Sequence, residues 1–221
     1  MDTLFQKPIT IITGHYGCGK TSLSLNLAMS GNYKSIIDLD VVNPFFRSSD
    51  YRKMIEDKGT RVIAPYFAGT NLDVPFIPKD VKTSVMFDEK VLIDAGGDDQ
   101  GSVALGTVSN EIKNRGYDLV YIVNFMRPQT RIAEEAFEIM KEIEAACHLY
   151  VTGIVNNTNL KQETTQEVVD YGVERTRELA RMAGLPILFH VQEKAFSYII
   201  GGTSEKIIRT ESYVLTPWEQ A

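Results

Sequence analysis

Short apolar runs alternate along the chain with longer stretches in which apolar residues recur at helical spacing. Seven such runs predict strands, at residues 9–13, 35–40, 61–64, 91–94, 119–124, 149–156 and 185–189. Most of them are continuously apolar, which is typical of strands that are covered on both faces. The pattern therefore predicts the α/β class, with a mainly parallel central sheet of about seven strands and helices on both faces.

Helical patterns fill the longer stretches, at residues 19–30, 44–58, 128–146 and 164–183. Glycine follows the first and the last of these patterns, as it does at many helix ends. The proline-containing residues 64–86 predict an irregular excursion and not a linker, because strands lie on both sides. We therefore expect one domain that spans residues 1–221.

Composition and charge limit the class of protein. The chain has 221 residues, of which 43% are hydrophobic and 24% charged, and its formal net charge is −6. This apolar content argues against intrinsic disorder. The N-terminal residues lack the regions of a signal peptide, and no apolar run approaches the roughly 18 residues that span a bilayer. We expect a cytoplasmic protein without a membrane anchor, and the acidic charge disfavours nucleic acid as a partner.

The segment from Gly14 to Thr21 reads GHYGCGKT and fits the pattern G-x-x-x-x-G-K-[ST]. It stands between an apolar strand and a helical pattern, the context that a phosphate-binding loop requires. Its glycines permit a tight turn whose N–H groups converge on phosphate oxygens, and the helix N-terminus adds its positive end. Lys20 is then expected to reach the β- and γ-phosphates, and the Thr21 hydroxyl to bind Mg²⁺. The alternative is a glycine-rich turn without a ligand.

Acidic residues end two of the predicted strands. Asp94 closes an apolar strand and Gly97 follows it, which is a Walker B pattern with a glycine that can approach a γ-phosphate. Asp38 and Asp40 occupy alternate positions and therefore point to the same side of their strand. Close carboxylates are costly unless they face a cation or water, so Mg²⁺ and an attacking water are the expected partners. Solvent-exposed acids at a strand end are the alternative.

Other polar residues are weaker candidates. Arg47 could stabilise transition-state charge, and a surface salt bridge explains it equally well. Within residues 98–100, Gln100 could position water, but solvated loop acids are the favoured interpretation. Residues 126–130 stand on the ligand side of a parallel sheet and could touch a nucleotide or a partner subunit, or simply start a helix. Cys18 could be acidified by the helix start, although a plain small-residue role is favoured. Two cysteines, Cys18 and Cys147, form neither a disulfide framework nor a metal-binding pair.

These motifs, in this order, resemble the CobQ/CobB/MinD/ParA group of P-loop ATPases in the SIMIBI class. The likeness is strongest to single-domain proteins with a GHYGxGKT loop and a DxDxVNPxFRSxD segment. The resemblance covers almost the whole chain. It implies a nucleotide-dependent homodimer in which two ATP sites face each other across the interface.

The resemblance also implies roles for single residues. Asp40 matches the residue that orients the hydrolytic water, and Asp94 the carboxylate that contacts Mg²⁺ through water. Asp38 matches either an outer-shell Mg²⁺ residue or a switch residue. Asn156 matches the asparagine that binds the adenine edge, and an asparagine can bond bidentately to that edge; a turn residue is the alternative. The guanine-reading pattern N-K-x-D is absent from residues 156–159, so ATP is favoured over GTP.

The expected site is therefore a set of residues spread over four strand ends. The nucleotide-binding residues are Gly14, His15, Tyr16, Gly17, Cys18, Gly19, Lys20, Thr21, Ser22, Gly97 and Asn156; the catalytic residues are Lys20, Asp38 and Asp40; the metal-binding residues are Thr21, Asp40 and Asp94. One departure from the family is His15, which stands where ParA- and MinD-type proteins carry a signature lysine. Histidine is mostly neutral at pH 7, so either activation across the dimer is weaker or another cation, such as Arg47 or Arg127, substitutes for the lysine; slow hydrolysis is predicted.

The leading functional hypothesis is a slow Mg²⁺-dependent ATPase that acts as a nucleotide-switched dimeric regulator or assembly factor for an unidentified client protein. One alternative is an ATP-dependent small-molecule enzyme, either a ligase like CobB and dethiobiotin synthetase or a kinase. A second is a carrier of metal or Fe–S clusters. A glutaminase domain, an arginine-rich lid, paired cysteines and a C-terminal basic amphipathic helix are all missing from the sequence. The regulator is therefore favoured by elimination.

Overall fold

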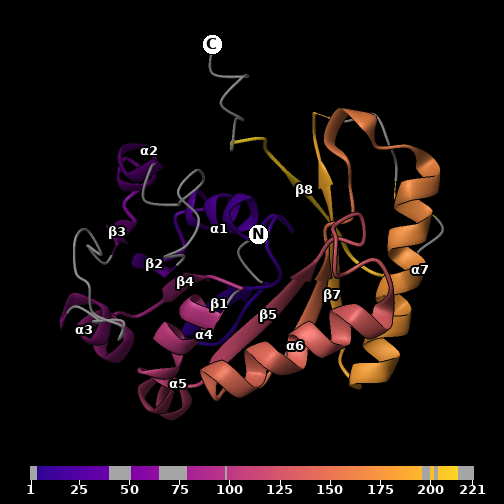
Figure 1. The fold of residues 1–221 in the computed structure, drawn as a ribbon. Coiled ribbons are helices and arrows are strands. Elements are labelled where there is room, and N and C mark those ends of the chain that lie inside the picture. The colour runs from indigo at the N-terminus through magenta and orange to yellow at the C-terminus, as the bar shows by residue number, and fades with distance from the viewer. Residues whose placement is uncertain are drawn as a thin grey trace.

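The structure is a computed structural model, and it describes residues 4–39, 51–64, 79–97, 99–195, 200–201 and 204–213. An eight-stranded sheet forms its centre, in the order β3-β2-β4-β1-β5-β6-β7-β8 (Figure 1). Each strand is parallel to its neighbours, so the expected mainly parallel sheet is confirmed. The strands are β1 Ile9–Thr13, β2 Ser35–Leu39, β3 Arg61–Ile63, β4 Val91–Ala95, β5 Tyr117–Val123, β6 Gly153–Asn156, β7 Ile187–Glu193 and β8 Ile207–Thr210.

Alternate side chains of the central strands enter two different apolar clusters. In β1, Ile9 and Ile11 belong to one cluster and Ile12 to the other, and all three are fully buried. A strand with apolar packing on both faces needs apolar residues at every position. This packing accounts for the continuously apolar runs from which the strands were predicted.

Helices cover both faces of the sheet, as expected. Residues of α3 to α7 contribute to the cluster that contains Ile9, whereas α1 and α2 contribute to the cluster that contains Ile12. Figure 1 shows α4, α5 and α6 together on one side of the strands and α1 apart from them. The helices are α1 Lys20–Ala28, α2 Arg52–Glu56, α3 Lys79–Phe87, α4 Asp99–Gly106, α5 Ser109–Arg115, α6 Ala133–Cys147 and α7 Gln166–Ala183.

Several boundaries differ from the predicted ones. The irregular excursion predicted for residues 64–86 is wrong at its end, because α3 begins at Lys79; residues 65–78 lie outside the described residues. The helix predicted at 44–58 is described only from residue 51 on, where α2 spans Arg52–Glu56. The helix predicted at 128–146 begins later, at Ala133, and the strand predicted at 149–156 begins at Gly153. Neither α4, α5 nor β8 was predicted.

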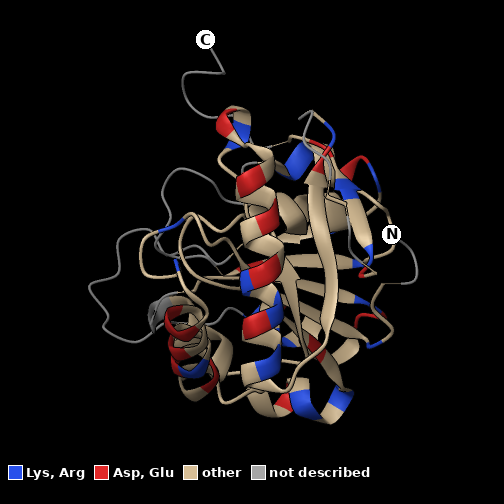
Figure 2. Ribbon diagram, turned by 90° about the vertical axis from the view of Figure 1, so that its right-hand side faces the viewer, with Lys and Arg blue, Asp and Glu red and all other residues tan. Residues whose placement is uncertain are grey.

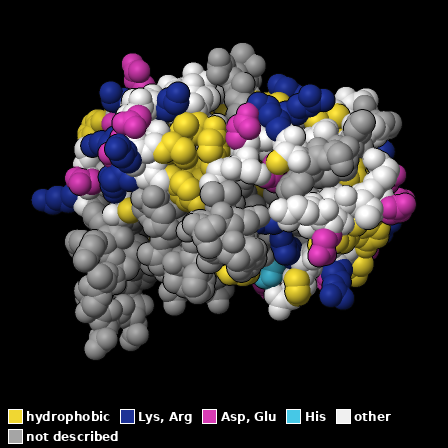
Figure 3. Space-filling view, turned by 90° about the horizontal axis from the view of Figure 1, so that it is seen from above, with side chains coloured by type: hydrophobic (Ala, Val, Ile, Leu, Met, Phe, Trp, Pro, Cys, Tyr) yellow, Lys and Arg dark blue, Asp and Glu magenta, His cyan; other side chains and the backbone are white. Residues whose placement is uncertain are grey.

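Charged residues of both signs lie on the outer surface. Figure 2 shows Lys, Arg, Asp and Glu along α7, which faces the viewer there, and the face seen in Figure 3 likewise mixes the two signs. Several of these residues are paired: Arg175 Nη1 lies 2.6 Å from Glu178 Oε2 within α7, and Arg177 Nη2 lies 2.9 Å from Glu205 Oε2 just before β8. Within the described ranges, no helix combines the length and apolar character needed to span a membrane.

Candidate phosphate-binding site

The phosphate-binding loop, residues 14–21, joins the end of β1 to the start of α1 and has the backbone of an anion cradle. Gly17 and Gly19 have φ angles of +73° and +96°, which favour glycine. A Cβ atom on Gly14 would stand 2.1 Å from the carbonyl oxygen of Ile122 in β5. The loop is therefore a tight left-handed turn, and it leads directly into a helix N-terminus, where backbone N–H groups attract anions.

Lys20 and Thr21 open α1, and both are buried. The ammonium group of Lys20 turns back across the loop and donates a hydrogen bond to the carbonyl oxygen of His15 at 3.4 Å. A lysine held inside its own loop in this way is positioned next to any anion that the loop N–H groups bind. Ser22, the next residue of the helix, is half-buried.

Asp38 and Asp94 lie side by side on neighbouring strands beside this loop. The two residues are in register between β2 and β4, and Asp94 is also in register with Ile12 of β1. Because side chains alternate along a strand, Asp38 shares its face with Ile36 and Asp94 shares its face with Leu92. Both of those residues belong to the cluster under α1. The two buried carboxylates therefore face the side of the sheet on which the phosphate-binding loop begins its helix.

This donor set fits Mg²⁺. Mg²⁺ prefers oxygen ligands and is usually held by one or two carboxylates together with substrate phosphates and water. Asp38, Asp94 and the Thr21 hydroxyl supply such oxygens at one edge of the sheet. Among the described residues, no three His, Cys, Asp or Glu side chains form a self-sufficient metal site. Asp40, the remaining predicted ligand, lies outside the described residues, as do Arg47 and Asp98.

Gly97 contacts the phosphate-binding loop through its backbone. A Cβ atom on Gly97 would stand only 1.7 Å from the carbonyl oxygen of Gly14. The segment after β4 can therefore approach the loop because residue 97 has no side chain. Of the acids that follow, Asp99 begins α4; its side chain and that of Gln100 lie outside the description.

Three side chains of the loop differ in exposure and charge. Tyr16 is 62% exposed, whereas Cys18 is buried. Burial raises the pKa of the Cys18 thiol, which argues against acidification by the helix start, the less favoured of the two interpretations of this residue. His15 is half-buried, and burial together with the nearby charge of Lys20 lowers the pKa of its imidazole. His15 is therefore neutral at pH 7 and supplies no constant cation.

Asn156 lies at the end of β6, but its amide is bonded inside the protein. Its Oδ1 accepts hydrogen bonds from the Thr158 N–H at 3.0 Å and the Thr158 hydroxyl at 2.7 Å, and its Nδ2 lies 3.0 Å from Nδ1 of His190. Asn157, which the sequence reasoning passed over, reaches the phosphate-binding loop instead. Its Nδ2 donates to the carbonyl oxygen of Cys18 at 2.8 Å. The tandem of two asparagines after a strand was the signal for this residue.

Arg127 contacts the same loop from the segment between β5 and α6. Its Nε donates a hydrogen bond to the carbonyl oxygen of Gly17 at 2.9 Å. Of the residues 126–130 that the sequence placed on the ligand side of the sheet, Arg127 is thus in contact with the loop. It approaches from the side of β5 and β6, whereas the aspartates approach from the side of β2 and β4.

Comparison with known proteins supports the fold. Cell division protein FtsY from Thermotoga maritima is 19% identical, with a TM-score of 0.54; the match covers 82% of this chain and 60% of that one. Signal recognition particle receptor FtsY from Elizabethkingia anophelis, in complex with GDP, is 17% identical with a TM-score of 0.46, over 83% and 56% of the two chains. No family model and no curated protein matches the sequence.

The chain therefore has a P-loop NTPase fold. At this identity the likeness to FtsY concerns the fold alone, and the chain corresponds to about three-fifths of the length of the Thermotoga protein. The fold class expected from the sequence is confirmed. The likeness does not single out the CobQ/CobB/MinD/ParA group within that class.

Proposed function

We propose that the chain binds a nucleoside triphosphate with Mg²⁺ at the phosphate-binding loop and hydrolyses it slowly. The observation that carries this proposal is the register of Asp38 with Asp94 beside the helix start that Lys20 and Thr21 form. A glycine-rich turn without a ligand would explain the loop alone. It would not explain why two neighbouring strands place acidic residues in register beside the loop, an arrangement that supplies the oxygen ligands Mg²⁺ prefers.

In the proposed reaction, this chain contributes positioning and charge. The loop N–H groups and the Lys20 ammonium bind the β- and γ-phosphates and stabilise the negative charge that spreads over the transferred phosphoryl group. Thr21 and Asp94 would hold Mg²⁺, which would supply positive charge against the same phosphoryl group. By resemblance, Asp40 orients the attacking water. The Gly97 backbone, which touches the loop, is placed to respond when the γ-phosphate leaves.

The nucleotide that we propose is ATP. Residues 156–159 read NNTN and lack the lysine and the aspartate of the guanine-reading pattern. Asn156 was the expected adenine contact, yet its amide already bonds to Thr158 and His190. Asn157 is the second candidate, because its amide lies against the loop itself. Competition between ATP and GTP for the wild-type protein tests this choice, and a tighter complex with GTP would reverse it.

The biological role that we propose is that of a cytoplasmic, nucleotide-switched regulator or assembly factor, as in the CobQ/CobB/MinD/ParA group. In this role ATP favours a dimer, hydrolysis reopens it, and a client protein responds to the state. We expect slow turnover because a neutral His15 stands in place of the signature lysine. Cys18 and Cys147 are both buried and belong to different apolar clusters, which disfavours a role as metal or Fe–S carrier.

The binding site is tested by the variant Lys20→Ala. Loss of a charge-assisted contact to phosphate should weaken ATP affinity by about 100-fold in titration calorimetry. Lys34→Ala is the matched control, because Lys34 is exposed and precedes β2 at the opposite end of the sheet. Equal ATP affinity in Lys20→Ala and Lys34→Ala would refute the site.

The catalytic step is tested separately by Asp40→Ala. This variant should bind ATP as the wild type does but release phosphate about 100-fold more slowly, since a water-orienting group has been removed. Wild-type turnover in Asp40→Ala would move that role to another residue while leaving the binding site intact. A pull-down with this hydrolysis-blocked variant is the direct way to find the client.

A further inference from the structure

Arg127 contacts the phosphate-binding loop, but phosphate and Mg²⁺ binding assign it no role. Besides the hydrogen bond from its Nε to the Gly17 carbonyl, the side chain lies close to the loop at Gly17. Its Cδ, Nε and Cζ atoms stand 3.5 to 3.9 Å from the place where a Cβ of Gly17 would be. A Cβ atom at position 17 would therefore be in van der Waals contact with the Arg127 side chain.

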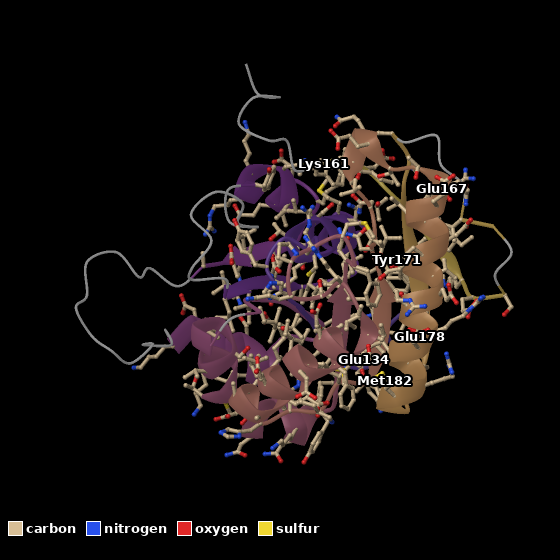
Figure 4. All side chains as sticks on the ribbon, turned by 45° about the vertical axis from the view of Figure 1, so that its right-hand side comes forward. Glu134, Lys161, Glu167, Tyr171, Glu178 and Met182 are labelled. Atoms are coloured by element: carbon tan, nitrogen blue, oxygen red, sulfur yellow. The ribbon has the colours of Figure 1, made fainter. Side chains whose placement is uncertain are left out.

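The segment that carries Arg127 is braced from two other elements. Asn124 Nδ2 donates to the carbonyl oxygen of Asn159, after β6, at 3.1 Å. The hydroxyl of Tyr171, which Figure 4 labels on α7, donates to the carbonyl oxygen of Arg131 at 2.7 Å. These bonds on both sides of Arg127 fix the backbone from which its side chain extends. The guanidinium group is thus pre-positioned, and little entropy is lost when it meets a ligand.

Arg127 has a carbonyl oxygen beside it but no carboxylate. Within the ranges that the structure describes, none of the ion pairs involves Arg127. The side chain is half-buried. A planar cation in this setting favours an anion or the face of a π-system, and a guanidinium group stacks on such faces more readily than an ammonium group does.

The strand order decides which end of a nucleotide this cation meets. The strand order around the loop is β2-β4-β1-β5-β6, so β1, which carries the loop, has β4 and β2 on one side and β5 and β6 on the other. The carboxylates of Asp38 and Asp94 mark the Mg²⁺ and γ-phosphate end on the β4 side. A nucleotide bound along the loop then directs its nucleoside toward β5 and β6, where Arg127 and Asn157 contact the loop.

We infer that Arg127 clamps the nucleoside end of the bound nucleotide by stacking its guanidinium group on the base. This inference rests on the proposed function. A stacking contact uses the π-face, which every base has, and does not distinguish donors and acceptors on the base edge. Arg127 therefore adds affinity for adenine and guanine nucleotides alike, and it binds diphosphate and triphosphate equally. A contact made equally in the ground state and the transition state changes affinity and leaves kcat unchanged.

The test compares Arg127→Ala with Arg131→Ala in nucleotide titrations and phosphate-release assays. Arg131 is an exposed arginine of the same segment, and both of its described hydrogen bonds use its backbone. Arg127→Ala should weaken ATP, ADP and GTP binding by the same factor, about tenfold, with kcat within about twofold of wild type. Arg131→Ala should match the wild type. Arg127→Lys, which retains the charge but not the plane, should recover less than half of the lost binding free energy.

Different results would overturn the inference. A lower kcat with unchanged ADP affinity would place Arg127 at the γ-phosphate, and unequal losses for ATP and GTP would show edge recognition. Full recovery in Arg127→Lys would show that charge alone acts. If the wild type binds nucleotides and Arg127→Ala binds them equally well, only this inference fails; if the wild type binds none, the proposed function fails.

Discussion

At the scale of single residues, Gly97 has no room for a side chain beside the carbonyl oxygen of Gly14. A Cβ atom would stand 1.7 Å from that oxygen, so Gly97→Ala must push the segment after β4 away from the phosphate-binding loop. We expect a loss of about 1–3 kcal/mol in the free energy of unfolding, measured by urea denaturation. Nucleotide affinity should fall with it. Gly201→Ala is the control, because a Cβ there would meet open space; equal stability of the two variants would contradict the prediction.

The positions of the phosphate-binding-loop residues in the fold could be predicted from the sequence, whereas the hydrogen-bond partners of side chains outside the loop could not. Lys20 and Thr21 are placed by a local pattern and a local helix start, and the structure has them there. The two asparagines 156 and 157 are adjacent, and which of them faces the loop depends on His190, which comes from a different strand. Cys18 shows the same limit, because burial outweighs the local effect of the helix start.

At the scale of elements, β6 and β7 are joined by a hydrogen bond that pH should break. Two donors of Thr158 fix Oδ1 of Asn156, so Nδ2 of Asn156 is the donor and Nδ1 of His190 the acceptor. Burial lowers the pKa of His190, Glu205 opposes this effect and Arg177 adds to it. The folded protein therefore holds a neutral imidazole at pH values where the unfolded chain is protonated. This contribution to stability is complete above about pH 6.5 and is lost as the pH falls through the lowered folded-state pKa.

The variant His190→Gln tests this linkage. It should cost about 1 kcal/mol of unfolding free energy at pH 8, the order of one buried hydrogen bond. Its stability should also fall less steeply between pH 7 and pH 5 than that of the wild type, as followed by urea denaturation across that range. His148→Gln is the matched control, because His148 is an exposed histidine at the end of α6. Parallel stability curves for the wild type and His190→Gln would exclude His190 as the titrating group.

Elements with a full apolar pattern were predictable, and those with a mixed one were not. Seven strands are covered well enough to show runs of apolar residues, whereas β8, with the sequence IIRT, is short, pairs only with β7 in the described sheet, and is only partly buried. α4 contains Gly101 and Gly106, which weaken a helical pattern. Gly101 is required there because a Cβ would stand 2.6 Å from the Cα of Gly96. Such close backbone contacts are properties of the fold and are invisible along the chain.

At the scale of the whole molecule, part of the negative net charge is located at the candidate site. Two of the acids that contribute to the net charge of −6 are buried at neighbouring strand ends beside the phosphate-binding loop. The outer surface mixes both signs, as the ion pairs along α7 illustrate. A negative total with mixed surface charges gives no long-range attraction for DNA or for an anionic membrane. A protein client or a second copy of the chain is therefore the partner class to examine first.

The final prediction concerns that second copy. If ATP closes a dimer, Asp40→Ala with ATP and Mg²⁺ should have twice the monomer mass in light scattering, because the variant binds ATP and turns it over about 100-fold more slowly than the wild type. The same variant with ADP should remain a monomer. Lys20→Ala should remain a monomer at an ATP concentration that just saturates the wild type, since its affinity for the nucleotide that couples the two subunits is about 100-fold weaker.

The combination of variants separates a switched dimer from two simpler outcomes. A dimer that forms equally in ADP, ATP and nucleotide-free samples would be constitutive, because a ligand with equal affinity for both states shifts no equilibrium. A monomer in all samples would remove the dimer from the proposed function. It would not affect the conclusion on ATP binding, which rests on the comparison of the wild type with Lys20→Ala. Because His15 is neutral, we expect the two subunits of an ATP-bound dimer to be held by contacts other than a cation at position 15. A dimer that persists at high salt would show that these contacts are largely uncharged.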